Sequence, residues 1–376
     1  MSTRFGFVST FPPTQCGLAT FTASLREALV AQDGDEGQVV RLVDAPEPRP
    51  SREVIAQIAN GDRAGLHRAV ERLNDCDVAI VQHEYGVYGG HDGADILPLL
   101  DGLTIPSIVV LHTVLVQPTR HQRDVLEAVM ARADAVVVMS ASGRDRLVAG
   151  YDTDLRKVSI IAHGAPAPDP AAAATAPLFR RGRPTVLTWG LLGPGKGIEW
   201  GIEAMAMLRD LDALYVVAGQ THPKVIQHEG EAYRTALQDR VRSLGLGAAV
   251  TFDGRYRDTE ALALLVQSAD VVLLPYDSLD QVTSGVLIEA VAAGKPVVAT
   301  GFPHAVELLA GGAGVIVTHC SPSEIAEALR TLITQGELAA RMAHVAVSSA
   351  ARLLWPAVAE QYRALAAQLI EAGIAA

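Results

Sequence analysis

A glycine-rich turn with one lysine is the sharpest chemical signal in the sequence. It reads GLLGPGKG from Gly190 to Gly197 and stands between the apolar run PTVLTW and the helical pattern IEWGIEAMAML. Glycines let the backbone approach a ligand closely, and a helix start offers unpaired N–H groups at the positive end of its dipole. Because Lys196 adds a full positive charge, the turn predicts a diphosphate site. The structural alternative is an ordinary strand-to-helix turn with a solvated lysine.

Two nucleotide-enzyme classes are disfavoured by their own motifs. The turn nearly matches the phosphate loop G-x-x-x-x-G-K-[ST] of kinases and ATPases, but position 197 is Gly, so the hydroxyl that would hold magnesium is missing. The first strand-to-helix turn, STFPPTQCGLAT, has no G-x-G-x-x-G, which disfavours a nicotinamide dehydrogenase.

A second polar segment precedes another helical pattern. Gln281 and Glu289 are eight positions apart, and Thr283, Ser284 and Gly285 stand where the helix would begin. A hydroxyl-and-glycine turn at a helix start exposes amides suited to an anion. Glu289, about one turn into the helix, could accept hydrogen bonds from a ribose diol. The structural alternatives are a simple N-cap for Ser284 and a solvated helix position for Glu289.

The first half carries a polar cluster after two apolar runs. His83, Glu84, Tyr85 and Tyr88 follow one run within VQHEYGVYGGHDG, and His112 follows another in LHTV. Open α/β sheets bind ligands in the crevice outside the carboxyl ends of their strands, so these residues are candidates for ligand binding. The alternative for each histidine is a capping or core-edge ring with its hydrogen bonds satisfied.

The elements that must position these residues form two alternating series. Apolar, β-branched runs, each followed by a helical pattern, predict two parallel sheets covered on both faces. The runs are 5–9, 39–43, 78–82, 108–111, 135–139 and 158–162 in the first half, and 185–189, 215–218, 250–252, 271–274, 296–299 and 315–317 in the second.

The domain boundaries follow from a proline-rich stretch. Prolines over 166–184 block helix and sheet pairing and predict a hinge there. We therefore expect two Rossmann-like, doubly wound domains, at 1–170 and 183–355, and a last helix over 357–372.

Bulk composition excludes several classes. With 376 residues, 49% hydrophobic and 19% charged, the chain is long enough for two packed domains. A net charge of -11 gives no electrostatic footprint for nucleic acid or an anionic membrane surface. Three dispersed cysteines argue against disulfides or a zinc site, and no signal peptide or membrane-spanning run is found, so we expect a cytoplasmic protein.

Together these segments resemble glycosyltransferase family 4. Its members share a strand-to-helix turn with a Lys-Gly pair and, further on, E-x7-E before A-x-x-x-G-x-P-V-V. The corresponding stretch here runs from Gln281 to Glu289 and on through AVAAGKPVV, and the opening FPPTQCGLATFTASL matches the family's first glycine loop and helix. The downstream FPHAVELL matches the family's G-x-x-E turn only loosely.

The resemblance implies a GT-B fold, in which two Rossmann-like domains face a cleft and the C-terminal helix, 356–376, crosses back to the first domain. It assigns the nucleotide-sugar donor to the second domain and the acceptor to the first, where the candidate acceptor-binding residues are His83, Glu84, Tyr85 and Tyr88. It further implies retention of anomeric configuration, a reaction without metal or cofactor, a donor-sugar contact by His112, and leaving-group stabilisation by Lys196 and the amides near Gly17 and Ser284.

Two positions depart from the family pattern. The first Glu of E-x7-E is Gln281, which can hydrogen-bond sugar hydroxyls but cannot act as a carboxylate nucleophile. Leu191 replaces the arginine that often stands five residues before the lysine, and the stretch DGRYRD, with Arg255, Tyr256 and Arg257, is the expected source of a replacement cation. Front-face transfer aided by the leaving phosphate is the expected mechanism, with His112, Gln281 and Lys196 as the catalytic group.

The sequence patterns FPP-x-x-CG-x-A-x-F and QVTSGVL resemble those of bacterial mannosyltransferases. They favour transfer of mannose from GDP-mannose to a saccharide acceptor, for example in elongating an oligo- or polysaccharide such as methylmannose polysaccharide. UDP-glucose is the alternative donor. A nucleotide-sugar 2-epimerase of the same fold and a catalytically silent sugar-nucleotide binding protein remain alternatives. The sequence leaves the oligomeric state open, a homodimer included.

Overall fold

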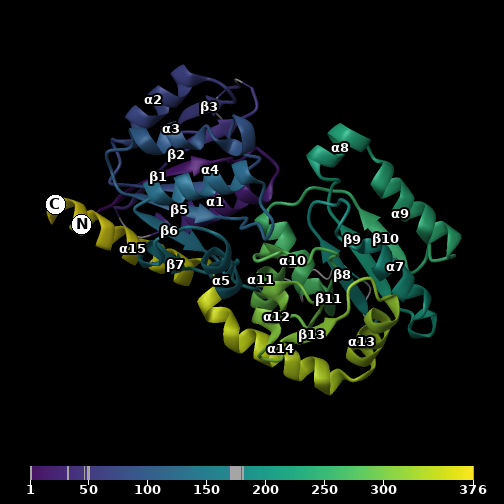
Figure 1. Cartoon of the computed structure of the whole chain (residues 1–376). Helices are drawn as coiled ribbons and strands as arrows, with labels where there is room; N and C mark the ends of the chain where they lie inside the picture. Colours follow the sequence, from purple (N-terminus) through teal and green to yellow (C-terminus); the bar gives the residue numbers. More distant parts are fainter. Residues whose placement is uncertain are drawn as a thin grey trace. The chain divides into compact units, whose positions relative to one another are not determined.

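The chain divides into two units, each built around a parallel sheet. The computed structural model describes residues 2–31, 34–45, 47–48, 51–169, 179 and 182–375. One unit comprises Met1–Gly164 with Trp355–Ala376, and the other comprises Ala165–Leu354 (Figure 1). Much of the expected hinge, at 170–178, 180 and 181, lies outside the described residues.

The first unit contains a parallel sheet with strand order β3-β2-β1-β4-β5-β6-β7. Most of its strands are uninterrupted apolar runs, as expected for strands covered on both faces. The strands are β1 (Arg4–Ser9), β2 (Glu36–Val43), β3 (Val54–Ala59), β4 (Val78–His83), β5 (Ser107–Leu111), β6 (Ala135–Val138) and β7 (Val158–Ile160).

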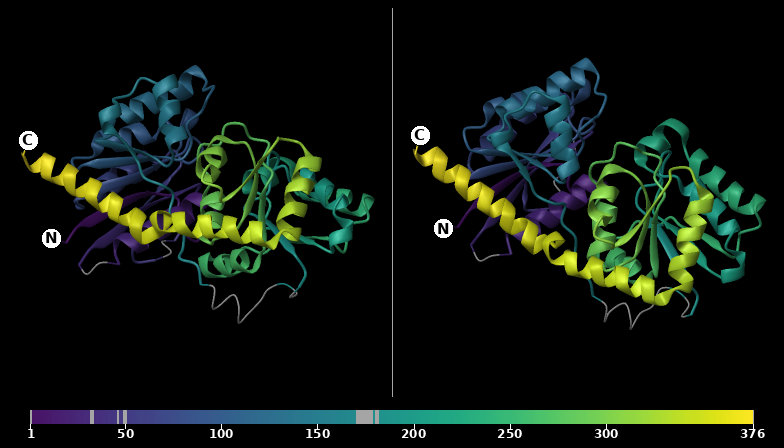
Figure 2. Two further views of the ribbon diagram at one scale, coloured as in Figure 1. Left: turned by 90° about the horizontal axis from the view of Figure 1, so that it is seen from below. Right: turned by 60° about the horizontal axis from the view of Figure 1, so that its bottom comes forward.

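The helices of the first unit cover the two faces of this sheet. They are α1 (Gly17–Leu29), α2 (Arg63–Leu73), α3 (Ile96–Gly102), α4 (Arg120–Arg132), α5 (Ala141–Gly150) and α15 (Trp355–Ala375), with short 3₁₀ turns η1 (His91–Gly93) and η2 (Leu155–Lys157). On one face, Phe21 and Leu25 of α1 share an apolar cluster with Phe5 of β1 and with Val358 and Tyr362 of α15. The last helix therefore belongs to the core of the first unit, and Figure 2 shows it in yellow, ending near the N-terminus.

The second unit repeats the plan with strand order β10-β9-β8-β11-β12-β13. Its strands are β8 (Thr185–Trp189), β9 (Leu214–Ala218), β10 (Val250–Asp253), β11 (Val271–Leu274), β12 (Val297–Thr300) and β13 (Gly314–Val317). Its helices and 3₁₀ turns are α7 (Ile198–Ala206), η3 (Arg209–Leu211), α8 (Pro223–Glu229), α9 (Ala232–Ser243), α10 (Thr259–Ser268), α11 (Gly285–Ala292), α12 (Pro303–Leu309), α13 (Pro322–Thr334), α14 (Gly336–Ala350) and η4 (Ala351–Leu353). Apolar side chains of α7, α9 and α13 bury one face of the sheet.

Both sheets reverse their strand order beside the first strand. In the first unit the reversal lies between β1 and β4, and in the second it lies between β8 and β11. Ligands of doubly wound sheets bind outside the carboxyl ends of the strands at such a switch point. The residues that directly follow β8 and β11, and those that follow β1 and β4, are therefore the places to look for a site.

The prediction of two Rossmann-like domains, with the last helix returning to the first, is confirmed. Each of the twelve predicted strands is present to within three residues at its ends, whereas β3 was not predicted. β3 reads VIAQIA and is only half-buried, because it lies at the edge of its sheet. Among the described residues, no helix combines the length and hydropathy needed to cross a membrane.

Candidate functional site

The glycine turn after β8 lies directly against the segment that follows β11. Gly197 has φ 60°, and a Cβ there would stand 1.8 Å from the carbonyl oxygen of Pro275, so only glycine allows this approach. The amide of Asp277 also donates to the carbonyl of Gly195 at 3.0 Å. The turn predicted to hold a diphosphate therefore lies against the segment that follows β11, and β11 is the strand beside β8 at the switch point.

Lys196 projects from this turn over an aromatic ring. Its Nζ lies 4.3 Å from the ring centroid of Tyr276, which is buried and stacked on Phe302 at a centroid distance of 5.2 Å. No carboxylate forms an ion pair with Lys196 among the residues that the structure describes. A half-buried ammonium held over an aromatic face and free of a counter-charge can meet an incoming anion.

The start of α11 is organised by Ser284 and a buried histidine. Ser284 Oγ accepts from the amide of Leu287 at 3.2 Å as the N-cap, and the Ser284 amide donates to Nδ1 of His304 at 2.9 Å. Gln281 donates through Nε2 to the carbonyl of Thr283 at 3.0 Å, and its own carbonyl accepts from the His304 amide at 3.3 Å. His304, which the sequence analysis did not single out, therefore sets the shape of this turn.

Two other amides remain for an anion. The Ser284 amide is already bound to His304, but Gly285 and Val286 stand in the first turn of α11, where a helix leaves its N–H groups without intrahelical acceptors. A Cβ at Gly190 would lie 3.7 Å from Cγ2 of Val286, so the first turn of α11 is next to the glycine turn. The first turn of α11, with the amides of Gly285 and Val286, thus lies beside the glycine turn that carries Lys196.

Glu289 lies one turn further along α11 and is tied to the end of β8. Its Oε2 accepts from the indole Nε1 of Trp189 at 3.2 Å. Burial of the carboxyl group raises the pKa of Glu289 to about 7, and the Trp189 hydrogen bond opposes this only in part. Glu289 is therefore not the solvated helix residue of the structural alternative.

The expected replacement cation is engaged elsewhere. Arg255 is exposed and donates through Nε to Asp253 at 2.9 Å, and Arg257 also pairs with Asp253. Hydrogen bonds from these two arginines hold the pKa of Asp253 well below its usual range. The neighbouring Tyr256 is exposed. Arg255 and Arg257 line a cavity of about 360 Å³ together with residues of β9, β10 and α10, and neither Lys196 nor Glu289 is among its lining residues.

A different arginine stands closer to the glycine turn. Arg234, on α9, donates through its guanidinium to the carbonyl of Gly219 and through Nε to Oγ1 of Thr221 at 3.2 Å. Gly219 is packed against Gly190, since a Cβ at Gly219 would lie 1.9 Å from the Gly190 carbonyl oxygen. A pattern of neighbouring residues could not reveal Arg234, because forty positions separate it from the glycine turn.

The carboxyl edge of the first unit gathers histidines that are uncharged at neutral pH. His83 ends β4 and is buried, and the His112 amide, just after β5, donates to the His83 carbonyl at 3.1 Å. His112 Nε2 donates to Oε1 of Gln82 at 2.7 Å. Burial lowers the pKa of His83 to about 4, and burial together with the neighbouring His163 and His83 lowers the pKa of His112 to about 3.

His163 is a member of this cluster that the sequence analysis did not predict. The ring of Phe21 lies at 4.9 Å, edge to face, from both His112 and His163, and Trp355 of α15 lies 5.3 Å from Phe21. Burial lowers the pKa of His163 to about 4. The histidines thus belong to an aromatic layer above the carboxyl ends of the strands, with His112 half-buried at its rim.

The predicted acceptor-binding residues differ in their burial and in the hydrogen bonds that they make within the unit. Glu84 accepts from the Tyr85 amide at 3.1 Å with one oxygen and from the Thr113 hydroxyl with the other. Tyr88 is buried and donates to the Gln82 carbonyl at 2.7 Å, so its hydroxyl is used inside the unit. Tyr85 is half-buried, and its hydroxyl lies 3.4 Å from the carbonyl of Gln122. Glu84 and Tyr85 are thus half-buried, whereas the buried Tyr88 shapes the loop that carries them.

Gly17 is the first residue of α1, at the switch point after β1. Cys16 is its N-cap, with Sγ accepting from the Ala19 amide at 3.4 Å. A Cβ at Gly17 would meet nothing within 4 Å, so there is room for a ligand against this helix start. The prediction that Gly17 contacts the donor stays a prediction, as does that of a cleft shared by the two domains.

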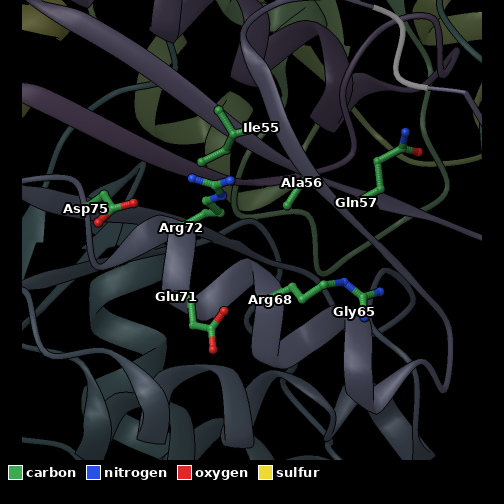
Figure 3. A pocket seen from close by; sticks show the side chains of 8 residues that line it. All are labelled: Ile55, Ala56, Gln57, Gly65, Arg68, Glu71, Arg72 and Asp75. Carbon is green, nitrogen blue, oxygen red and sulfur yellow. The ribbon is translucent and has the colours of Figure 1, made fainter.

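One surface hollow of the first unit lies apart from the predicted site residues. A cavity of about 570 Å³ is bounded by β3 and α2 of the first unit, and Figure 3 shows Arg72 reaching from α2 toward Ile55. Its lining mixes the charges of Arg68, Arg72, Glu71 and Asp75. None of the predicted site residues lines it, and it takes no part in the proposals below.

The sequence relatives of this chain carry glycosyltransferase names. Residues 174–347 match the family described as glycosyl transferases group 1. Over 283 residues the chain is 27% identical to the D-inositol 3-phosphate glycosyltransferase of Corynebacterium kroppenstedtii, covering 68% of this chain and 60% of the relative. Over 289 residues it is 30% identical to the protein of the same name from Corynebacterium diphtheriae, covering 70% of this chain and 65% of that one.

The solved structures it resembles share both units. Sucrose-phosphate synthase from Thermosynechococcus elongatus aligns with a TM-score of 0.78 at 20% identity, over 98% of this chain and 100% of that one. Anabaena HepE in complex with UDP-glucose aligns with a TM-score of 0.75 at 18% identity, over 98% and 100% of the two chains. At these identities the likeness establishes the fold.

Proposed function

We propose that this chain, whose residues 174–347 match the glycosyl transferases group 1 family and which has the GT-B fold, transfers a hexose from a nucleoside diphosphate donor to a hydroxyl group of an acceptor. The observation that carries this proposal is the convergence of Lys196, the amides of Gly285 and Val286, and Glu289 at the switch point of the second unit.

Each of these groups matches one part of a nucleoside diphosphate. Breaking the bond between sugar and phosphate places negative charge on the departing diphosphate and positive charge on the ring. Lys196 and the two helix-start amides are preorganised to stabilise that negative charge, a role that needs no metal ion. Glu289, with one oxygen held by Trp189, can accept hydrogen bonds from the ribose diol with the other. Arg234, which is paired with Glu231, holds the Gly219 carbonyl beside the glycine turn and so helps to fix the shape of the site.

We propose that the reaction retains the anomeric configuration without a covalent intermediate. Gln281 stands where the family has a glutamate, and its amide donates to the Thr283 carbonyl, so this position offers no carboxylate nucleophile. The acceptor hydroxyl then attacks from the face that the diphosphate leaves, and a phosphate oxygen takes its proton. The neutral ring of His112 serves as a hydrogen-bonding group for the donor sugar, since its lowered pKa keeps it uncharged at pH 7.

For the donor we propose GDP-mannose, because the sequence patterns of the first loop and of the QVTSGVL segment resemble those of bacterial mannosyltransferases. UDP-glucose is the second candidate, because the HepE structure that shares this fold holds it. For the acceptor we propose a saccharide. The name of the corynebacterial relatives adds a phosphorylated polyol, D-inositol 3-phosphate, as a defined acceptor to try. The chain spans about 60% of the length of the first of these relatives, so acceptor and linkage belong to the proposal.

Thermal unfolding in the presence of GDP, UDP, ADP and dTDP sugars tests the donor. A ligand that binds only the folded chain at about 100 times its Kd stabilises it by about 2.7 kcal/mol, which is readily seen as a rise in Tm. We expect GDP-mannose to give the largest rise and to be consumed only when an acceptor is added. Isomerisation of the donor alone identifies a 2-epimerase, and protection without turnover for any acceptor identifies a silent binding protein.

A further inference from the structure

Three potential metal ligands converge on the surface of the first unit, outside the groups assigned above. Nδ1 of His91 lies 2.8 Å from Nδ1 of His121, which in turn lies 2.9 Å from Oδ2 of Asp92. The third side of this triangle, from His91 Nδ1 to Asp92 Oδ2, measures 3.4 Å. Because His121 lies in the first turn of α4, thirty positions after His91, the fold brings these residues together and the sequence does not.

Hydrogen bonds alone do not satisfy this triangle well. A neutral imidazole carries one N–H, so a proton on His121 Nδ1 can point at His91 or at Asp92, but not straight at both. A cation at the centre would be approached by all three lone pairs at once. With metal–ligand bonds of about 2.0–2.2 Å, two ligands of one ion stand about 3.0 Å apart at right angles and about 3.4 Å apart at the tetrahedral angle. The three measured separations lie close to this range.

The surrounding residues hold the ligands in place. Asp92 has φ 53° and ψ 30°, a left-handed conformation that aspartate tolerates better than most residues but that still needs support. Gln122 Nε2 lies 3.5 Å from the other carboxylate oxygen, Oδ1. Gln122 is itself fixed by a capping box with Thr119 at the start of α4. An outer group that orients a ligating carboxylate in this way is typical of metal sites.

The ligands are also accessible. The side chains of His91, His121 and Asp92 are 76%, 45% and 19% exposed, so an ion can enter and keep water in its open positions. Two imidazole nitrogens and one carboxylate oxygen suit borderline first-row ions better than magnesium or calcium, which prefer oxygen ligands alone.

We propose that His91, Asp92 and His121 bind a divalent first-row transition ion, zinc foremost, which ties the turn η1 to the start of α4. This ion plays no part in stabilising the diphosphate. Its effect falls on the loop between β4 and α3, which carries Tyr85: a Cβ at Gly93, at the end of η1, would lie 2.9 Å from the Tyr85 carbonyl oxygen. Binding of the ion orders this loop.

The test measures metal binding directly, on the full chain without a histidine tag. Calorimetric titration with ZnCl₂ and visible absorption with CoCl₂ are expected to show one ion per chain and a rise in Tm that EDTA reverses. His121→Ala and Asp92→Asn are each expected to weaken binding tenfold or more, on the order of the loss seen when metal-site residues are removed. Asparagine suits the left-handed position of Asp92, so Asp92→Asn keeps the turn.

His67→Ala is the matched control, because His67 is an exposed histidine of α2 in the same unit. It should bind as the unchanged protein does, and all variants should share one Tm in EDTA. Equal zinc affinity in the unchanged protein and in the double variant His91→Ala/His121→Ala overturns the proposal and leaves a hydrogen-bonded cluster. Because metal binding is measured without donor or acceptor, the result is independent of the proposed transfer activity.

Discussion

The two switch points have the same topology and opposite chemistry. In the second unit, Lys196 has no ion pair among the described residues, and the first amides of α11 lack intrahelical acceptors. In the first unit, His83 and His112 are neutral at pH 7, and both carboxylate oxygens of Glu84 are hydrogen-bonded within the unit. One edge is thus suited to an anion and the other to an uncharged, hydroxyl-rich ligand.

The difference shows that the topology of a doubly wound sheet determines where a ligand binds but not which class of ligand binds there. Parallel strands and their helices bring loops to the carboxyl edge in both units. What decides the ligand is whether the charged and polar groups there are left unpaired or are satisfied internally. In the second unit glycines keep the edge open, since Gly190 and Gly197 have positive φ and carry no side chain. In the first unit Phe21 and Trp355 fill the edge around His163.

Lys196→Ala is expected to have the largest effect, and it tests whether the edge of the second unit binds an anion. Removing a preorganised group that stabilises transition-state charge costs about 10²–10³ in kcat. Lys196 makes no side-chain hydrogen bond among the described residues and packs only on the Tyr276 face, so Tm should change little. Steady-state kinetics with the best donor, beside thermal unfolding of the same samples, measures both effects.

Two further variants make the Lys196 result specific. Lys196→Arg keeps the charge and should recover part of the activity. Arg242→Ala removes an exposed cation of α9 and should be neutral in kcat. A large loss of Tm with intact turnover in Lys196→Ala would return the turn to the structural alternative.

Glu289→Gln tests the uncharged part of the donor site. The proposed hydrogen bonds from the ribose to a carboxylate are worth roughly 1.5–3 kcal/mol, so donor KM should rise about 10- to 100-fold while kcat changes less. The pKa of about 7 adds a pH signature. In the unchanged protein donor KM should fall as pH rises from 6 to 8 and the carboxyl ionises, whereas the variant should show a flat profile. An unaltered donor KM removes Glu289 from the site.

Glu289→Gln is expected to weaken donor binding but to make the folded protein more stable at high pH. Because the folded-state pKa lies above the unfolded value, the folded protein disfavours the ionised carboxylate, and stability falls as pH rises from about 4.5 to about 7. Glutamine escapes this penalty and can still accept from Trp189. Glu289→Gln should therefore match the unchanged protein at pH 4.5 and be more stable at pH 8, by an amount that urea unfolding at the two pH values measures.

Sequence periodicity is sufficient to predict the strands of both sheets but not the contacts between the loops that follow them. Buried parallel strands are continuous apolar runs, so β4, β5, β8 and β11 were recognisable at once. β3 escaped, because an edge strand with Gln57 in its middle lacks that signal. The glycine turn was also readable, since close backbone approach and positive φ both demand glycine.

The residues that sequence reasoning missed act across long separations. Arg234 reaches the loop after β9 from α9, and His304 reaches back twenty residues to the amide of Ser284. His163 and His112 both pack against the ring of Phe21. No spacing along the chain encodes such contacts, because they depend on which strand neighbours which in the sheet. Arg255 and Arg257 are the expected sources of a replacement cation, and the structure pairs both with Asp253.

The smallest expected effects separate two tyrosines that the sequence treated alike. Tyr88→Phe removes a buried hydrogen bond to the Gln82 carbonyl and should cost about 1 kcal/mol of stability, with acceptor KM unchanged. Tyr85→Phe removes a half-buried hydroxyl that lies 3.4 Å from the Gln122 carbonyl and beside Tyr151, and should lower Tm less than Tyr88→Phe does while raising acceptor KM a few-fold. Urea unfolding and acceptor titrations on both variants measure this split. If Tyr88→Phe raises acceptor KM at constant stability, the first unit binds its ligand deeper than the half-buried rim of Glu84 and Tyr85, and the contrast between an open edge and a filled one no longer holds.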